Sequence, residues 1–243
     1  MEIDLFIPCF IDQVYPETAW NTVKVLEKAG CKINYNPNQT CCGQPSFNSG
    51  YWKETKNLAK KFIKDFEGEN LIVSPSASCS GFIKNNYEKI FSENKDNKKD
   101  LDNSVLLKQR MFELTDFLVN KLKITDLGAE FNHKITYHDS CSALREYGIK
   151  KEPRILLSKV KGLELIEMET SEVCCGFGGT FSVKFKGISS AMAQQKVEWA
   201  METGAEYIVG TESSCMLNIQ SYIKKHNLAI KTIHIADILA SGY

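Results

Sequence analysis

The chain has 243 residues, of which 43% are hydrophobic and 25% charged, and 30 Lys and Arg residues balance 30 Asp and Glu residues. These values are ordinary for a globular protein that is large enough to bury a core without cross-links. The lack of a basic excess argues against a nucleic-acid partner or an anionic membrane partner. The unusual number is that of the cysteines, which is nine.

The N-terminal segment MEIDLFIPCF contains an apolar stretch without a basic leader or a small-residue cleavage site. We therefore interpret it as a first strand and not as a signal peptide. No apolar run approaches the roughly 20 residues that cross a bilayer. We expect a cytoplasmic protein with no transmembrane segment, whose thiols stay reduced. Nine cysteines in such a chain indicate metal or redox chemistry.

Strand and helix patterns alternate over the first 91 residues. A helix that begins near Pro16 and ends at Gly30 has typical boundary residues. A later amphipathic helix has Leu58, Phe62 and Phe66 on one face. In chain order we predict a strand at 5–9, a helix at 16–30, a strand at 31–36, a helix at 52–66, a strand at 71–77 and a helix at 81–91.

The middle of the chain separates two similar units. Residues 92–103, SENKDNKKDLDN, are charged and have no apolar period, so we predict a solvated loop there. Periodicity is lost again over 120–132. We therefore predict a first domain over residues 1–125 and a second over residues 126–243.

The second unit repeats the order of the first. We predict a strand at 133–141, a helix at 152–160, a strand at 163–169, a helix at 189–204, a strand at 207–211 and a helix at 214–226. Alternating strands and helices predict parallel sheets with right-handed crossovers. The expected fold class is α/β, with two duplicated domains that each have a small parallel β-sheet flanked by helices.

Most of the cysteines belong to this repeat. A Cys-Cys-Gly sequence occurs at 41–43 and again at 174–176, and each has one cysteine before it and one after it. Equivalent cysteines are separated by 132 to 136 residues. Each follows a predicted strand, and the carboxyl ends of parallel strands meet at one sheet edge. We therefore predict two cysteine clusters: Cys9, Cys41, Cys42 and Cys79, and Cys141, Cys174, Cys175 and Cys215.

Three kinds of chemistry could use these quartets. Adjacent cysteines have Cα atoms about 3.8 Å apart, which is too close for an unstrained disulfide. A single zinc ion usually takes spaced pairs such as C-x2-C. A polynuclear iron–sulfur cluster tolerates neighbouring thiolates better, and Gly43 and Gly176 allow close approach or a positive φ. Iron–sulfur binding is therefore our first hypothesis, with structural zinc and thiol–disulfide exchange as alternatives.

The patterns C-x31-CC-x36-C and C-x32-CC-x39-C resemble those of the CCG-domain (cysteine-rich domain) iron–sulfur proteins, which include one of the polypeptides of heterodisulfide reductase and the glycolate oxidase iron–sulfur subunit. Within the family, HDSCSALREYGIKKEPRILL (138–157) and CCGFGG (174–179) resemble the lactate-utilization members. The resemblance implies that the eight quartet cysteines bind 4Fe-4S clusters, of an unusual noncubane type, or zinc in one site. It also implies electron transfer in the oxidation of L-lactate to pyruvate, with a ferredoxin-like iron–sulfur partner subunit.

The chain departs from the fullest family motif at two positions. That motif ends in C-x-x-C, but the first of these positions is Ser76 in one copy and Glu212 in the other. Each quartet therefore lacks a fifth cysteine, and an oxygen ligand becomes an option. For Glu212 we favour an exposed loop residue over a ligand.

Several other residues lie near the predicted clusters. His138, three residues before Cys141, is either a ligand or proton-transfer group or an ordinary strand-end histidine. For Asp139 and Arg145 we favour surface solvation over a role in orienting ligands or binding an anionic substrate. Cys31 has no counterpart in the second copy, so we interpret it as a small buried apolar residue.

Two further patterns need no ligand. Asp116 and Asp237 recur in the closing segments FELTDFL (112–118) and IHIADIL (233–239), and we predict that they cap helices. GFGG at 176–179 lacks the Lys-Ser/Thr and the spacing of a phosphate loop, so we predict no nucleotide binding.

Overall fold

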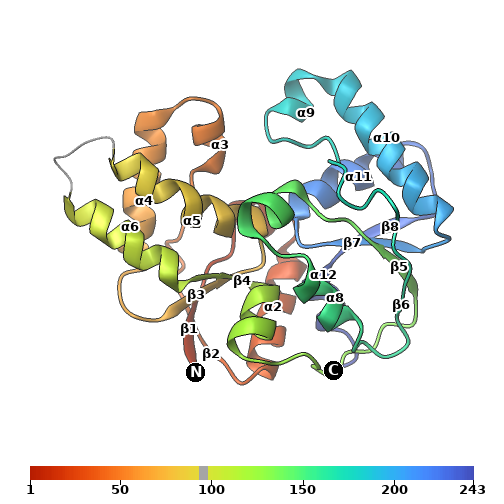
Figure 1. The fold of residues 1–243 in the computed structure, drawn as a ribbon, viewed down its shortest axis with the longest axis horizontal. Coiled ribbons are helices and arrows are strands. Elements are labelled where there is room, and N and C mark those ends of the chain that lie inside the picture. Colours follow the sequence, from red (N-terminus) through yellow and green to blue (C-terminus); the bar gives the residue numbers. More distant parts are fainter. Residues whose placement is uncertain (93–97) are drawn as a thin grey trace.

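The computed structural model describes residues 1–92 and 98–243 and contains two four-stranded parallel sheets (Figure 1). In each sheet the first strand of the copy is central. The orders are β2-β1-β3-β4 and β6-β5-β7-β8. The strands are β1 (Glu2–Leu5), β2 (Lys32–Tyr35), β3 (Leu71–Ser74), β4 (Met111–Glu113), β5 (Lys134–Tyr137), β6 (Glu164–Leu165), β7 (Tyr207–Gly210) and β8 (Lys231–His234).

Helices connect the strands and cover the sheets. The first half contains α1 (Cys9–Val14), α2 (Pro16–Lys28), α3 (Gln44–Asn48), α4 (Trp52–Asp65), α5 (Ala77–Ser92), α6 (Lys98–Arg110), α7 (Leu114–Asp116) and the π-helical segment η1 (Phe117–Lys121). The second half contains the π-helical segment η2 (Ser142–Tyr147), α8 (Lys151–Leu157), α9 (Phe181–Lys184), α10 (Lys186–Glu202), α11 (Ser213–Lys225) and α12 (Ile235–Leu239). Among the described residues, no helix is both long and apolar enough to cross a membrane.

The predicted fold class is confirmed, and two element predictions were wrong. Residues 98–103, expected in a solvated loop, lie in α6, and residues 93–97 of the same expected loop lie outside the described residues. The strand predicted over 163–169 is reduced to β6, because it pairs with β5 only at its two residues. The division of the chain after residue 125 stays a prediction.

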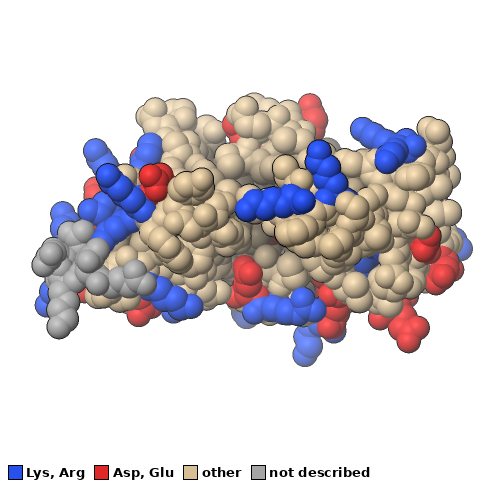
Figure 2. Space-filling view, turned by 90° about the horizontal axis from the view of Figure 1, so that it is seen from above, with Lys and Arg blue, Asp and Glu red and all other residues tan. Residues whose placement is uncertain are grey.

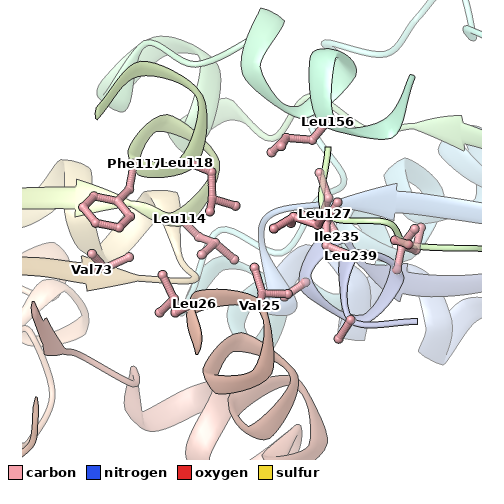
Figure 3. Packing of buried hydrophobic residues seen from close by; sticks show 14 of the residues in the cluster. Val25, Leu26, Val73, Leu114, Phe117, Leu118, Leu127, Leu156, Ile235 and Leu239 are labelled. Atoms are coloured by element: carbon pink, nitrogen blue, oxygen red, sulfur yellow. The ribbon is translucent and has the colours of Figure 1, made fainter. Parts of the chain in front are cut away.

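One apolar core is shared by the two halves (Figure 3). Val25 of α2 lies beside Ile235 and Leu239 of α12, which closes the second half, and Leu26 lies in the same cluster on the side of Val73. In the same way, α8 of the second half packs against α7 and η1, which close the first half. Each closing segment therefore covers the first long helix of the other copy, and burial of this surface holds the halves together.

Each half also has a core of its own behind its cysteine loops. In the first half Phe6 makes edge-to-face contacts with Phe62 and Phe66, at centroid distances of 4.8 and 5.8 Å. In the second half Val197 and Ile219 pack with Met216. These cores fix the sheet edges from which the cysteine side chains extend.

Candidate metal centres

The first quartet is assembled from the ends of three adjacent strands. Cys9 begins α1 directly after β1, the Cys41–Cys42 pair follows β2, and Cys79 lies in the first turn of α5 after β3. Because β2, β1 and β3 are neighbours in one sheet, these three loops meet at its carboxyl edge. Cys42 is 2% exposed, whereas Cys9 is open to solvent.

The four thiols of this quartet contact one another in a chain. Hydrogen bonding with Cys42, and then with Cys9, lowers the pKa of Cys41 to about 3. Hydrogen bonding with Cys42 also lowers the pKa of Cys79. Hydrogen bonding with Cys41 raises the pKa values of Cys9 and Cys42. Along the series Cys9, Cys41, Cys42, Cys79, the pKa is therefore raised and lowered alternately, which favours a thiolate at Cys41 and at Cys79.

The second quartet has the same construction. Cys141 immediately precedes η2, the Cys174–Cys175 pair lies in the loop after β6, and Cys215 lies in the first turn of α11. Hydrogen bonding with Cys141, and then with Cys175, lowers the pKa of Cys174 to about 2. Hydrogen bonding with Cys175 lowers the pKa of Cys215 to about 6. The two predicted clusters of thiols are therefore both present in the fold.

A glycine shapes the loop after each cysteine pair. Gly43 and Gly176 have φ values of 94° and 86°, in the left-handed region that glycine adopts most easily. In this conformation the amide of Gly43 donates to Sγ of Cys41, and that of Gly176 donates to Sγ of Cys174, both at 3.4 Å. Backbone amides therefore support the negative charge of the first thiolate in each pair.

His138 extends the donor set of the second quartet. A ring nitrogen of His138 and the sulfur atoms of Cys175 and Cys215 all lie within 4.8 Å of one another. His138 is 1% exposed. His138 is therefore buried beside this quartet, and its role as a ligand stays a prediction.

Lys196 on α10 is a charged residue near this quartet that sequence reasoning missed. Its side chain is fully buried, and Nζ donates to the carbonyl oxygens of Thr170 at 2.6 Å and Ser171 at 3.3 Å. Burial lowers its pKa to about 8, while the nearby Cys175 and Cys174 act in the opposite direction. The available signal was its position among Ala193, Val197 and Ala200 on the apolar face of that helix.

The comparisons with known proteins identify this cysteine arrangement. The family model for the cysteine-rich domain, CCG, matches residues 3–84 and 135–220. The chain belongs to the cysteine-rich domain family. It is 41% identical to "Lactate utilization protein A" of Bacillus subtilis (strain 168), over 99% of this chain and 100% of that protein. It is 43% identical to "Lactate utilization protein A 1" of Bacillus mycoides (strain KBAB4), over 98% and 96% of the respective chains.

A solved structure shares the fold of this cysteine-rich domain protein. A hypothetical protein from Helicobacter pylori superposes with a TM-score of 0.63 at 12% sequence identity. The alignment covers 100% of this chain and 49% of that chain. At this identity the likeness shows the fold alone.

Ser76 and Glu212, the two residues that replace the first cysteine of a C-x-x-C motif, contact each other. The hydroxyl of Ser76 donates to Oε1 of Glu212 at 3.3 Å. Glu212 also accepts from the amide of Ser78 at 2.5 Å and from its hydroxyl at 2.8 Å. Glu212 is 3% exposed, so the expectation of an exposed loop residue was wrong. Burial, and then the charges of Cys79 and Cys215, raise its pKa well above the ordinary value.

The two charged residues near His138 differ in their surroundings. Asp139 is 2% exposed and forms a bidentate ion pair with Arg154, at 2.9 and 2.8 Å, so the expectation of surface solvation was wrong for this residue. Arg145 is exposed, as expected, and donates to the carbonyl oxygen of Glu172.

The predicted helix caps lie three residues earlier than expected. The capping acceptors are Glu113 for α7 and His234 for α12. Asp116 instead accepts from Tyr147 Oη, and Asp237 accepts from Thr18 and Asn21. Both aspartates therefore bond the closing segment of one copy to the other copy.

Cys31 has the surroundings that we predicted for it. It is 7% exposed and packs in the shared core. Its pKa is raised by burial, and none of the eight quartet cysteines contributes to that shift.

The molecular surface is mostly uncharged near the middle of the end that carries α3 and α9 (Figure 2). Apart from a few Lys or Arg side chains, the charged residues seen there lie toward the periphery, around a central hollow. The chain termini lie at the opposite end of the molecule (Figure 1).

The quartets fit the metal centres that their donor chemistry suggests. All nine cysteines are free thiols, and the loops after equivalent strands bring four of them to the edge of each sheet. Thiolate sulfur is the donor that iron–sulfur clusters and zinc prefer. Each group combines a buried member of the Cys-Cys pair with a more exposed one, which is compatible with entry of a metal from solvent.

Proposed function

We propose that the chain is the iron–sulfur subunit of a lactate-utilization complex and transfers electrons in the oxidation of L-lactate to pyruvate. The observation that carries this proposal is the pair of four-thiol groups at the two sheet edges. The full-length similarity to lactate utilization proteins A supports the substrate.

The eight quartet cysteines would hold the clusters. A bound iron–sulfur cluster supplies a centre that accepts and releases single electrons. The chain's own residues prepare the donors, because the amides of Gly43 and Gly176 and the neighbouring thiols stabilise thiolates. The buried carbonyl oxygens of Cys42 and Cys175 accept hydrogen bonds from Tyr87 and Asn218, at 2.7 and 2.8 Å, which fixes both loops.

The partner would be another iron–sulfur protein of the ferredoxin type. The described residues build donor sets for centres within this chain, and a complete path from lactate needs a further acceptor. The middle of this face, which is mostly uncharged apart from a few charged side chains, is compatible with docking of such a protein.

The test is anaerobic purification with iron, acid-labile sulfide and zinc counted per chain. We expect iron and sulfide in near-equal amounts, with visible absorbance and a paramagnetic resonance signal on reduction. Cys42→Ala and Cys175→Ala should each remove about half of the iron. Cys31→Ala is the matched control, because it removes a buried cysteine outside both quartets and should leave the iron content unchanged.

Other results would replace the proposal. Stoichiometric zinc without iron would make the chain a zinc-binding structural protein. A metal-free chain that reversibly forms a disulfide within Cys41–Cys42 or Cys174–Cys175 would make it a thiol–disulfide redox protein.

A further inference from the structure

We infer that His138 is a metal ligand of the second quartet, so that the second centre is bound by nitrogen and sulfur while the first is bound by sulfur alone. This inference rests on the proposed function and deepens it, because it assigns different ligands to the two centres.

The geometry places His138 inside the ligand sphere of a single ion. Its ring nitrogen and the sulfur atoms of Cys175 and Cys215 lie within 4.8 Å of one another, somewhat above the separations that a single bound ion would impose. Metal–sulfur and metal–nitrogen bonds of about 2.3 and 2.0 Å allow donor separations of up to roughly 4 Å around a tetrahedral ion. Only a small adjustment of these side chains is needed to close the site.

The imidazole has no other use in the described part of the chain. The side chain is 1% exposed, and neither ring nitrogen has an oxygen or nitrogen partner, so that the polar neighbour of the imidazole is the sulfur of Cys215. A buried polar group left without a partner is costly. The nearest carboxylate along the chain, Asp139, is already engaged in its ion pair with Arg154. Metal coordination satisfies the imidazole where the protein does not.

The first copy shows what the same backbone position does without a ligand. His138 N donates to the carbonyl oxygen of Val209 at 2.8 Å, and Phe6 N donates to that of Val73 at 2.9 Å. The main chains are therefore equivalent. The Phe6 ring, however, packs against Phe62 and Phe66 in an apolar core. The copies thus differ in one donor atom beside otherwise matching quartets.

The surroundings of the second quartet are also more polar. Lys196 is buried beside it, bonded to the carbonyl oxygens of the segment that leads to Cys174. A neutral imidazole and a nearby ammonium group both make a centre easier to reduce than thiolates alone do.

The test uses full-length protein that carries histidine labelled with ¹⁵N in the imidazole ring, purified anaerobically with its metal. Pulsed paramagnetic resonance of the reduced iron centres should show the nitrogen coupling of a directly bound imidazole, which changes between ¹⁴N and ¹⁵N. If the second quartet carries zinc, zinc-edge X-ray absorption should show nitrogen as well as sulfur neighbours.

Two variants identify which histidine is responsible. His138→Phe introduces the residue that the first copy has at this position, and it should abolish the nitrogen coupling. His133→Ala changes a histidine that lies just before β5 and pairs with Glu206, and it should leave the coupling intact. If His138→Phe does not fold, His138→Gln takes its place: loss of the coupling in that variant, with the coupling kept in His133→Ala, supports the inference, and a retained coupling overturns it.

The outcomes separate this inference from the proposed function. Metal bound to the second quartet without a histidine nitrogen overturns the inference and leaves the proposed function standing. A chain that binds no metal at either quartet after anaerobic purification and reconstitution overturns both.

Discussion

Gly43 and Gly176 occupy equivalent places after the two cysteine pairs but have different surroundings. A Cβ atom on Gly176 would lie 2.8 Å from the carbonyl oxygen of Ser189 and 2.9 Å from Cβ of Met192. On Gly43 the nearest atom would be Cβ of Leu58 at 3.5 Å, an ordinary contact. Both glycines have a positive φ, so alanine strains the backbone at either position, and at Gly176 it also causes a steric clash.

We therefore expect Gly176→Ala to be the more damaging substitution. It should lower the free energy of unfolding by about 2–3 kcal/mol, against about 1 kcal/mol for Gly43→Ala. Urea unfolding of the two variants measures the difference. Equal losses would show that the loop after Cys175 can move away from α10.

The capping residue Glu113 should make stability depend on pH. It is fully buried, and burial raises its pKa from 4.5 to about 7. The folded state therefore keeps a proton that the unfolded chain releases, and the free energy of unfolding falls as pH rises between these values, by about 3 kcal/mol. Glu113→Gln should remove this contribution, as measured by urea unfolding at pH 5, 6.5 and 8.

The control for this prediction is Glu164→Gln, on the exposed end of β6. It should keep the wild-type pH dependence. An unchanged slope in Glu113→Gln would mean that the carboxyl group is not protonated in the folded protein.

Single residues were predictable where a repeated spacing revealed them. The eight cysteines, the two glycines and Cys31 were found because the two copies can be compared position by position. The role of the eight quartet cysteines as metal ligands stays a prediction. The burial of Glu212 could not be found in this way, because its partners Ser76 and Ser78 lie more than 130 residues away in sequence.

At the scale of elements, the π-helical segment η2 joins the two halves. Tyr147 at its end donates to Asp116 Oδ2 at 2.6 Å and accepts from the amide of Glu113 at 2.9 Å. Tyr147→Phe removes both bonds, which leaves the Glu113 amide without this acceptor and Asp116 with only its bond from Asn120, so we expect a loss of about 1–3 kcal/mol in the free energy of unfolding. Chemical denaturation measures it.

Tyr243→Phe is the matched control for this substitution. It removes one hydrogen bond, to the carbonyl oxygen of Leu239, near the exposed C-terminus. Its effect should be under about 1 kcal/mol. Equal effects at the two positions would contradict a special role for η2.

Elements were predictable where apolar residues follow a clear period. The strands at the centres of the sheets and the long helices α2, α4 and α11 were found for this reason, whereas α10 was placed by the glycine at its end, Gly204. α6 was missed, because it is strongly charged and its buried residues include only Ser104 and Leu107. The length of β6 was overestimated, because an alternation of apolar and polar residues does not show how many residues of a strand pair with the neighbouring strand.

At the scale of the whole molecule, the shared core predicts cooperative unfolding. Leu26, Leu118, Leu156 and Leu239 come from both halves and are at most 1% exposed in one cluster. Neither half can keep this surface buried alone, so we expect one unfolding transition for the full chain. Circular dichroism and tryptophan fluorescence should give coincident urea curves.

The positions of the three tryptophans make the test specific. Trp20 and Trp52 lie in the first half and Trp199 in the second. In Trp20→Phe/Trp52→Phe the fluorescence reports on the second half alone. A separate midpoint for that signal would show that the halves unfold independently.

The architecture as a whole was largely predictable, since the repeat and the alternation of strands and helices gave two small parallel sheets with clustered cysteines. The packing of the closing segment of each copy, α7 with η1 and α12, against the other copy was not predictable from the sequence. Asp116 and Asp237 were recognised as equivalent and assigned a local role, whereas their bonds to Tyr147 and to Thr18 and Asn21 cross between copies. A repeated sequence shows which positions are equivalent in the two copies, but it does not show which residues of one copy contact the other.

The bond between Glu212 and the serines of the first copy limits how the two copies can diverge. The two copies have the same order of strands and helices, and here a side chain from the second bonds the amide and the hydroxyl of Ser78 in the first. Descendants of this gene that lose the acid at position 212 should therefore carry a compensating replacement at Ser76 or Ser78, so that the three positions are inherited as a set.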